Sequence, residues 1–223
     1  KNNTKKGTRF VSYAASIGMN ALDADCGEYL RRNLQNFDEI SVREEGSKKY
    51  LSQFCEKEPL CVLDPVFLLN RSQWEGQIKS IPKHTEKYIF VYCAEENKKL
   101  VRYANKLAKE KGLKIYVCDN IFRQWSGNIT RKNEANPFDT LAYLRDAEYV
   151  VTNSFHGLVT SIIFEKQFAV FFHSKRNERQ KSVINTAQLN ARIVTEIDSF
   201  DIDEKIDYKN AKTLLDVKIK ESK

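Results

Sequence analysis

Residues 149–157 read Tyr149-Val150-Val151-Thr152-Asn153-Ser154-Phe155-His156-Gly157, and this stretch decides the fold. Its first four residues form an apolar, β-branched run that is typical of a buried strand. The almost wholly apolar segment of residues 155–164 then predicts a buried helix. A buried strand that leads directly into a buried helix indicates an α/β fold with a parallel sheet.

The same alternation extends through the second half of the chain. Apolar runs predict parallel strands near residues 88–93, 113–118, 148–152 and 168–172. Gly112 and Pro137 mark the end of one helix and the start of another. The expected helices cover residues 95–111, 136–145, 155–164 and 176–188, with a last one from Tyr208. We therefore expect a second Rossmann-like domain over residues 87–223.

A shorter β-α-β-α-β series occupies the first part of the chain. Strands are expected at residues 9–14, 39–42 and 60–63, with helices at 26–36 and 44–54. We expect residues 1–69 to be the C-terminal part of a first Rossmann-like domain that lacks its opening strands. Residues 70–86 are polar and show no sustained period, which predicts a linker. The chain begins with Lys1 rather than Met, so we expect a fragment.

The composition of the 223 residues is that of a folded protein, with 41% hydrophobic and 30% charged residues. It excludes a disordered chain, and no apolar run reaches the roughly 18–20 residues that span a bilayer. The formal net charge is +7. Because the basic residues are spread along the chain, we expect a generally basic surface or a basic cleft for a phosphorylated or acidic substrate. A nucleic-acid partner is not expected.

The five cysteines, Cys26, Cys55, Cys61, Cys93 and Cys118, are odd in number and show no C-x-x-C spacing. The pattern therefore indicates neither a zinc site nor a disulfide framework. Together with a polar N-terminus unlike a signal peptide, it predicts a protein of a reducing compartment, the cytoplasm.

The polar junction within residues 152–157 is the strongest candidate site. Ligands of parallel sheets bind outside the carboxyl ends of the strands, and a helix that begins there presents backbone N–H groups to an anion. His156 is suited to donate or accept a proton near pH 7, and Gly157 would let a ligand approach the backbone. The alternative is structural: Asn153 or Ser154 caps the helix and His156 is a core imidazole.

Arg43 ends a predicted strand, and its planar guanidinium could clamp a carboxylate or a phosphate. The alternative is a surface ion pair with Glu44 or Glu39. Another strand runs into a small junction with Ser16 and Gly18, which would bring backbone close to a ligand.

A basic segment with Lys175 and Arg179 follows the strand of residues 168–172 and lies beside His173. It is either a phosphate site or a solvated loop.

These segments together closely resemble the polysaccharide pyruvyl transferase family. The resemblance is carried by residues 147–157, 161–164 and 168–170, and by residues 12–18, 41–44 and 63–65. Asn177-x-Arg179 and Leu189-Asn190-x-Arg192 are weaker matches. The segments keep the family's order over nearly the whole chain, but the Gly-rich strand–loop–helix with which the family usually begins has no counterpart here.

The resemblance implies an enzyme of two Rossmann-like units in the glycosyltransferase-B architecture. It implies transfer of a pyruvyl group from phosphoenolpyruvate to a sugar hydroxyl of a cell-surface polysaccharide or its lipid-linked precursor, with no metal or redox cofactor. His156 would then be the proton donor or a phosphate-contacting acid, and Arg43 would hold the donor's carboxylate or phosphate. The expected substrate-binding residues are Asn153, Ser154, Gly157, Ser16, Gly18, Lys175 and Arg179.

The implied partners are phosphoenolpyruvate and a glycan or lipid-linked oligosaccharide acceptor, with peripheral association at the inner face of a membrane left open. Two other classes also stay open. A nucleotide-sugar-dependent glycosyltransferase would use the same architecture, and a non-catalytic glycan-binding module would need no donor.

Overall fold

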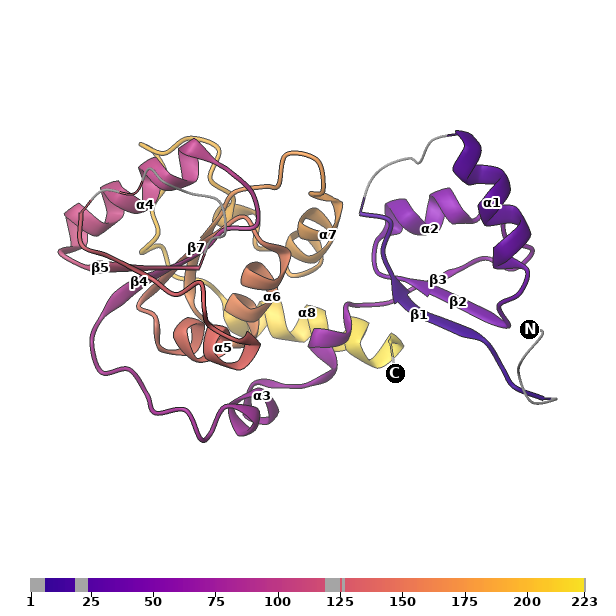
Figure 1. Ribbon diagram of the computed structural model, residues 1–223, viewed down its shortest axis with the longest axis horizontal. Helices are drawn as coiled ribbons and strands as arrows, with labels where there is room; N and C mark the ends of the chain where they lie inside the picture. Colours follow the sequence, from indigo (N-terminus) through magenta and orange to yellow (C-terminus); the bar gives the residue numbers. More distant parts are fainter. Residues whose placement is uncertain (1–6, 19–23, 119–124, 126, 223) are drawn as a thin grey trace.

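The computed structural model describes residues 7–18, 24–118, 125 and 127–222. Two parallel sheets form the centres of two α/β units (Figure 1). The N-terminal unit is built on a three-stranded sheet of order β1-β2-β3, and the C-terminal unit on a five-stranded sheet of order β6-β5-β4-β7-β8. All strand pairs in both sheets are parallel, which confirms the predicted α/β class.

The N-terminal unit follows the predicted series closely. Its elements are β1 (Val11–Ala15), α1 (Ala24–Leu34), β2 (Glu39–Val42), α2 (Glu45–Leu51) and β3 (Leu60–Cys61). Figure 1 shows α1 and α2 on the same side of this sheet. The short strands place the residues that follow β2 and β3 at one edge.

The C-terminal unit has four strands near the predicted positions. Its elements are β4 (Tyr88–Tyr92), α4 (Lys98–Lys111), β5 (Lys114–Cys118), β6 (Ile129–Arg131), α5 (Pro137–Asp146), β7 (Tyr149–Thr152), α6 (Phe155–Ile163), β8 (Gln167–Val170), α7 (Glu178–Thr186), the 3-10 turn η2 (Asn190–Arg192) and α8 (Tyr208–Glu221). The edge strand β6 was not predicted. Gly112 ends α4 in the left-handed conformation, with φ +64°, as its position indicated.

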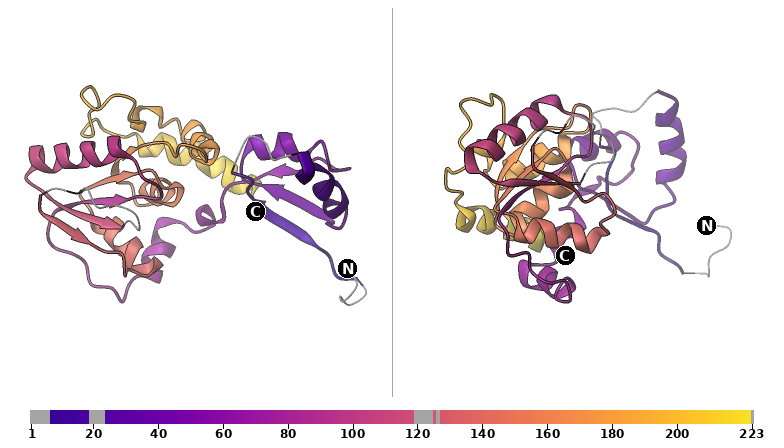
Figure 2. Two further views of the ribbon diagram at one scale, coloured as in Figure 1. Left: turned by 45° about the horizontal axis from the view of Figure 1, so that its top comes forward. Right: turned by 60° about the vertical axis from the view of Figure 1, so that its left-hand side comes forward.

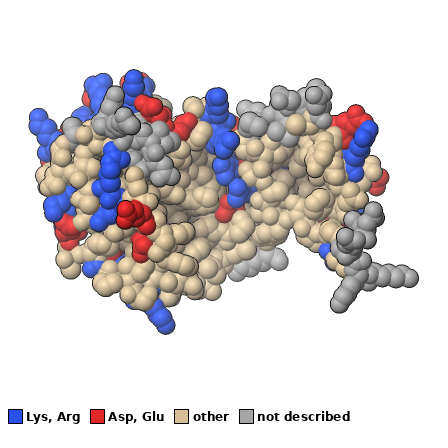
Figure 3. Space-filling model, viewed as in Figure 1, with Lys and Arg blue, Asp and Glu red and all other residues tan. Residues whose placement is uncertain are grey.

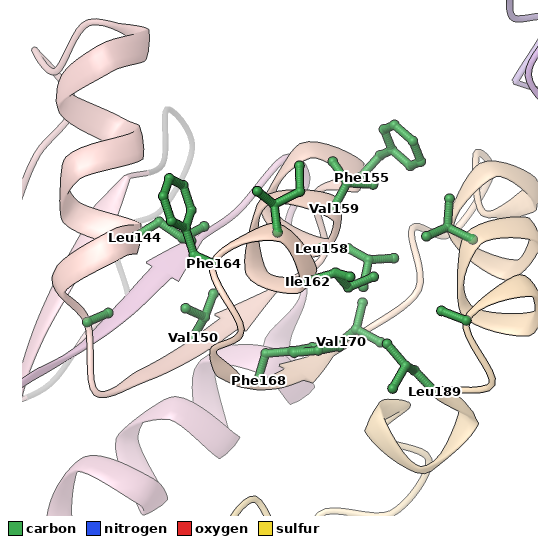
Figure 4. Packing of buried hydrophobic residues seen from close by; sticks show 14 of the residues in the cluster. Leu144, Val150, Phe155, Leu158, Val159, Ile162, Phe164, Phe168, Val170 and Leu189 are labelled. Carbon is green, nitrogen blue, oxygen red and sulfur yellow. The ribbon is translucent and has the colours of Figure 1, made fainter. Parts of the chain in front are cut away.

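The five-stranded sheet is buried on both faces. Because neighbouring residues of a strand point to opposite sides, its strands contribute to two separate cores. In β4, Tyr88 and Phe90 join the core around α5 and α6, whereas Ile89 and Val91 join the core under α4. Helix α6 is buried almost all round. Figure 4 shows its residues Leu158 and Ile162 packed near Phe168 and Val170 of β8. This packing fixes α6, and with it the start of the helix, on the sheet.

The segment between the two sheets is more ordered than a free linker. It contains the 3-10 turn η1 (Pro65–Leu68) and the helix α3 (Arg71–Gln77), which begins with a capping box between Asn70 and Gln73. Phe67 and Ile78 belong to the core of the C-terminal unit. The sequence predicted a linker over residues 70–86 and did not predict the helix α3 within it, whereas the domain boundaries themselves stay a prediction.

Helix α8 forms a second connection between the units (Figure 2). Its residues Ala211 and Leu215 are buried in the core of the C-terminal unit. Just beyond the helix, Ser222 reaches the N-terminal unit, where its carbonyl accepts from the Tyr13 hydroxyl at 2.7 Å. The Ser222 hydroxyl oxygen also accepts from the Leu63 backbone N–H at 2.9 Å. The C-terminal end of α8 is thus bonded to β1 and to the segment after β3.

The visible surface mixes charges of both signs. Figure 3 shows acidic side chains interspersed among lysines and arginines on this face rather than one continuous basic area. Within the described part of the chain, no helix combines the length and apolar character needed to cross a bilayer.

Candidate active site

A cleft lies at the carboxyl edge of the five-stranded sheet, where β4 and β7 are neighbours. The strand order reverses at this pair, because β5 and β6 lie beside β4 on one side and β8 lies beside β7 on the other. Open α/β sheets bind ligands at such a reversal of strand order. The cleft has a volume of about 280 Å³ and is lined by Tyr92, Ala94, Asn153, Ser154, Phe155, His156, His173, Arg176, Arg179 and Gln180.

A larger cleft of about 540 Å³ lies at the other end of α6 and has a mostly apolar lining. The side chains with acid–base or anion-binding chemistry gather instead at the start of α6. We therefore take the smaller cleft as the candidate site.

Gly157 allows α6 to pack closely on β7. A Cβ atom at this position would overlap the Thr152 hydroxyl oxygen and would lie 3.0 Å from Thr152 Cβ. Thr152 is held in place, because its hydroxyl donates to the Tyr92 carbonyl at 2.7 Å and accepts from the Ser154 N–H at 3.0 Å. Gly157 therefore serves helix–strand packing, which sets the height of the first turn of α6 above the sheet.

His156 lies in that first turn and is exposed along the cleft. Desolvation by the surrounding protein lowers the pKa of His156. The nearby Asp64 carboxylate opposes this effect, and the guanidiniums of Arg43 and Arg179 lower the pKa further. The neutral imidazole therefore predominates at pH 7. The same interactions show that groups of both units lie within electrostatic reach of His156.

Arg43 directly follows β2, and Asp64 comes shortly after the neighbouring strand β3. The Arg43 guanidinium donates a hydrogen bond from Nη1 to Asp64 Oδ2. Asp64 is buried, and its other carboxylate oxygen accepts from the Val66 N–H at 3.1 Å, capping η1. The partner of Arg43 is thus Asp64, with Glu44 Oε1 4.0 Å from Arg43 Nε.

Phe155 brings Arg43 and Arg179 to one place. The guanidinium carbon of Arg43 lies 5.8 Å from the centre of the Phe155 ring, and that of Arg179 lies 5.1 Å from it. Cations over an aromatic face gain roughly 0.5–2 kcal/mol, depending on desolvation. Figure 4 shows Phe155 at the start of α6 with its ring directed away from the packed sticks of the helix. Desolvation and then the charge of Arg43 lower the pKa of Arg179, which reflects how close the two cations are.

Ser16 and Gly18 reach the site only indirectly. The Ser16 hydroxyl donates to Oε1 of Glu44, a carboxylate buried behind the two arginines. Gly18 has φ +69°, a left-handed conformation that favours glycine, and it belongs to the loop after β1. Neither residue lines the cleft.

Asn153 and Ser154 lie at the centre of the cleft floor, where their side chains are already bonded within the protein. The Asn153 amide accepts from the Ala94 N–H at 2.8 Å and donates to the Glu95 carbonyl at 2.8 Å. Ser154 is the N-cap of α6 and accepts from the Gly157 N–H at 3.4 Å. The Asn153 side chain thus joins the carboxyl ends of β4 and β7, whereas the Ser154 side chain caps α6.

The basic segment after β8 is a folded loop around His173. Nδ1 of His173 accepts from the N–H groups of Lys175 and Arg176, both at 3.2 Å. Glu95 holds the same loop by accepting from the Ser174 hydroxyl at 2.7 Å. Lys175 is exposed outside the cleft, whereas Arg176 lines it. Arg176 is thus the cation that this loop contributes.

The structure brings together the predicted residues His156, Arg43 and Arg179, and the predicted residues Asn153 and Ser154 line the same cleft. Sequence reasoning assigned no role to Asp64, Phe155 or Arg176, and it considered Glu44 only as a surface ion-pair partner of Arg43. Asp64 could have been found from its place after a strand at the same edge as Arg43. Phe155 adjoins His156, but its contacts with two arginines depend on tertiary structure. Within the described residues, no cluster of three or more His, Cys, Asp or Glu could hold a metal ion.

Solved structures with a similar fold share little sequence with this chain. The wall teichoic acid polymerase TagF (H548A) has a TM-score of 0.51 and 13% identity, covering 99% of this chain and 64% of its own. The UDP-GlcNAc 2-epimerase of Methanocaldococcus jannaschii has a TM-score of 0.46 and 11% identity, covering 83% of this chain and 55% of its own. The Neisseria meningitidis epimerase has a TM-score of 0.46 and 12% identity, covering 86% and 56%.

The chain thus spans 55–64% of the length of these structures. The likeness to TagF shows the fold and confirms the expected glycosyltransferase-B-like architecture. A search among curated proteins finds no match.

A family profile supplies the assignment that the fold alone does not give. The profile described as polysaccharide pyruvyl transferase matches residues 1–174, well over half of the 223 residues. The matched part includes β2 with Arg43, β3 with Asp64, and the start of α6 with His156. The chain therefore belongs to the polysaccharide pyruvyl transferase family, a family of transferases.

Proposed function

We propose that this protein transfers a pyruvyl group from phosphoenolpyruvate to hydroxyls of a sugar. The supporting observation is the convergence of Arg43 and Arg179 on Phe155, beside His156, in a chain of this family. Phosphoenolpyruvate carries a carboxylate and a phosphate on the same carbon. Two guanidiniums from different units suit such a doubly anionic donor, because planar guanidiniums bind both groups with paired hydrogen bonds.

In this proposal the donor's enol CH₂ carbon receives a proton, and a sugar hydroxyl attacks the carbon that bears the carboxylate. Phosphate leaves with its electron pair, and a second hydroxyl of the sugar closes a cyclic ketal. One hydroxyl hydrogen is thereby balanced by the new methyl group and the other by the released phosphate. In this scheme Arg43 and Arg179 stabilise the departing phosphate, and the Asp64 carboxylate favours positive charge at the attacked carbon.

His156 is the proposed proton donor. Its lowered pKa means that little imidazolium is present at pH 7 in the free protein. A phosphate dianion beside the ring favours the charged form, so donor binding raises the fraction that can deliver a proton. Proton transfer is then confined to the complex with donor.

The proposed acceptor is a glycan of the cell surface or its lipid-linked precursor, met at the inner face of the membrane. The family assignment supports a polysaccharide acceptor. The odd number of cysteines and the lack of C-x-x-C spacing support the proposed cytoplasmic location.

Thermal unfolding with candidate donors tests the proposal. A ligand at ten times its Kd stabilises the native state by about 1.4 kcal/mol, which raises Tm by roughly 3–6 °C in a domain of this size. We expect this rise with phosphoenolpyruvate and its loss in Arg43→Ala. A rise with nucleotide sugars alone would instead indicate a glycosyltransferase, and a response to glycan without any donor would indicate a binding module.

A further inference from the structure

Glu44 is a buried carboxylate placed between the two arginines of the candidate site. It is 1% exposed. Its Oε1 atom lies 4.0 Å from Arg43 Nε and 3.8 Å from Arg179 Nε, although these arginines belong to different units. Among the described residues, neither of these buried Nε–H groups has a hydrogen-bond acceptor. Glu44 therefore supplies the negative charge that both Nε groups face.

Two serines fix the Glu44 carboxylate in this place. Ser16, in the loop after β1, donates to Oε1, and Ser47, in the first turn of α2, donates to Oε2 at 2.6 Å. Glu44 occupies the N-cap position of α2, yet its side chain caps no backbone N–H of that helix. Its carboxylate is thus turned away from the helix and toward the arginines.

This arrangement has a consequence for the two guanidiniums. Arg43 and Arg179 carry like charges and contact the same Phe155 ring, so they repel each other. A carboxylate behind both Nε groups offsets the repulsion and restrains each planar group about its long axis. The Nη groups then stay available to other partners, as shown by the Arg43 Nη1 hydrogen bond to Asp64.

We propose that Glu44 is a positioning residue that holds Arg43 and Arg179 in register as one binding face for the anionic donor. The inference rests on the proposed function, because the anion is phosphoenolpyruvate. Glu44 touches no reacting atom in this scheme and acts through the arginines. Its contact with Arg179 also makes the donor site dependent on both units being in place.

The direction in which Glu44→Gln changes the Kd for phosphoenolpyruvate distinguishes a positioning role from simple electrostatics. Removing a negative charge beside an anion site makes the site more positive and, by itself, tightens anion binding. If Glu44 positions the arginines, Glu44→Gln weakens binding instead, because the neutral amide no longer attracts the two guanidiniums to one place. We expect the Kd for phosphoenolpyruvate, measured by titration calorimetry, to rise roughly 10–100-fold, because removing one partner of a buried charge pair is strongly unfavourable.

The matched control is Glu45→Gln, which removes the neighbouring, exposed carboxylate and should leave the Kd unchanged. Equal or tighter binding by a folded Glu44→Gln protein overturns the inference. Absence of phosphoenolpyruvate binding in the wild type refutes the proposed function instead. KM for the donor should rise with kcat nearly kept, since the lost interaction serves donor binding.

Two further variants keep the inference testable if Glu44→Gln fails to fold. Ser16→Ala and Ser47→Ala keep the carboxylate and each remove one hydrogen bond that fixes it. Each should weaken donor binding by about 3–10-fold. Unchanged binding in both variants contradicts a positioning role. In an Arg179→Ala background the effect of Ser47→Ala should shrink, and full additivity would show that Glu44 does not act through Arg179.

Discussion

Replacing Gly157 by Ala tests whether this glycine serves packing between α6 and β7. The new methyl would overlap Thr152 Oγ1 and lie 3.2 Å from Thr152 Cγ2. Overpacking of this kind costs about 1–3 kcal/mol. Moving the Thr152 hydroxyl also endangers its bonds to the Tyr92 carbonyl and the Ser154 N–H, each worth roughly 0.5–1.5 kcal/mol. The better helix propensity of Ala returns at most about 1 kcal/mol.

The expected result for Gly157→Ala is therefore a loss of about 1–3 kcal/mol in the free energy of unfolding. Urea denaturation followed by circular dichroism measures it. Gly76→Ala in α3 is the matched control, because an added Cβ there meets nothing within 4 Å. That change should be neutral or stabilise by about 0.4–1 kcal/mol.

A second variant identifies the contact responsible. Thr152→Ala removes the hydroxyl and methyl that the new Cβ would meet, so Gly157→Ala should cost less in that background than in the wild type. If Gly157→Ala proves as stable as Gly76→Ala, the packing argument is wrong.

Three further predictions concern chemistry. Arg43→Lys keeps the charge but loses the planar fork, and donor binding by calorimetry should weaken by about 1.5–3 kcal/mol; unchanged affinity would leave Arg43 as the ion-pair partner of Asp64 alone. His156→Gln should lower kcat by roughly 10²–10⁴-fold and remove the alkaline limb of the pH–rate profile; wild-type turnover with an unchanged profile contradicts proton transfer. Asp64→Asn removes the group that raises the pKa of His156, so NMR should find that pKa lower and kcat/KM should fall away at a lower pH than in the wild type. An unshifted imidazole titration argues against that coupling.

The sequence predicted the sheets better than the segments between them. Strand β4 was evident because every residue of 88–91 is buried, alternately in the two cores, which makes a continuous apolar run. Strand β6 has only three residues and one large apolar side chain, Ile129, so it shows no period. Helix α3 is exposed and also lacks an apolar period, yet its capping box at Asn70 and Gln73 was a readable signal.

Some residues of the candidate site could also be predicted from the sequence, whereas their contacts could not. Arg43 and His156 were predictable because strand ends in a parallel sheet meet at one edge. The pairing of Arg43 with Asp64, and of Glu44 with Arg179, depends on how loops and units pack, which local pattern does not specify. The roles of Asn153 and Gly157 likewise depend on neighbours from β4 and β7. The sequence therefore predicted the sheet edge at which the site lies, whereas the contacts between its side chains are seen only in the structure.

The path of α8 bears on how the two units can move. The two units are connected at two places, through residues 62–70 and through the contacts of Ser222 after α8. Two connections restrain the relative motion of the units more than a single linker would. The 3.8 Å contact between Glu44 and Arg179 lies between the two units, so the donor-binding face depends on this restraint as well as on the interior of each sheet.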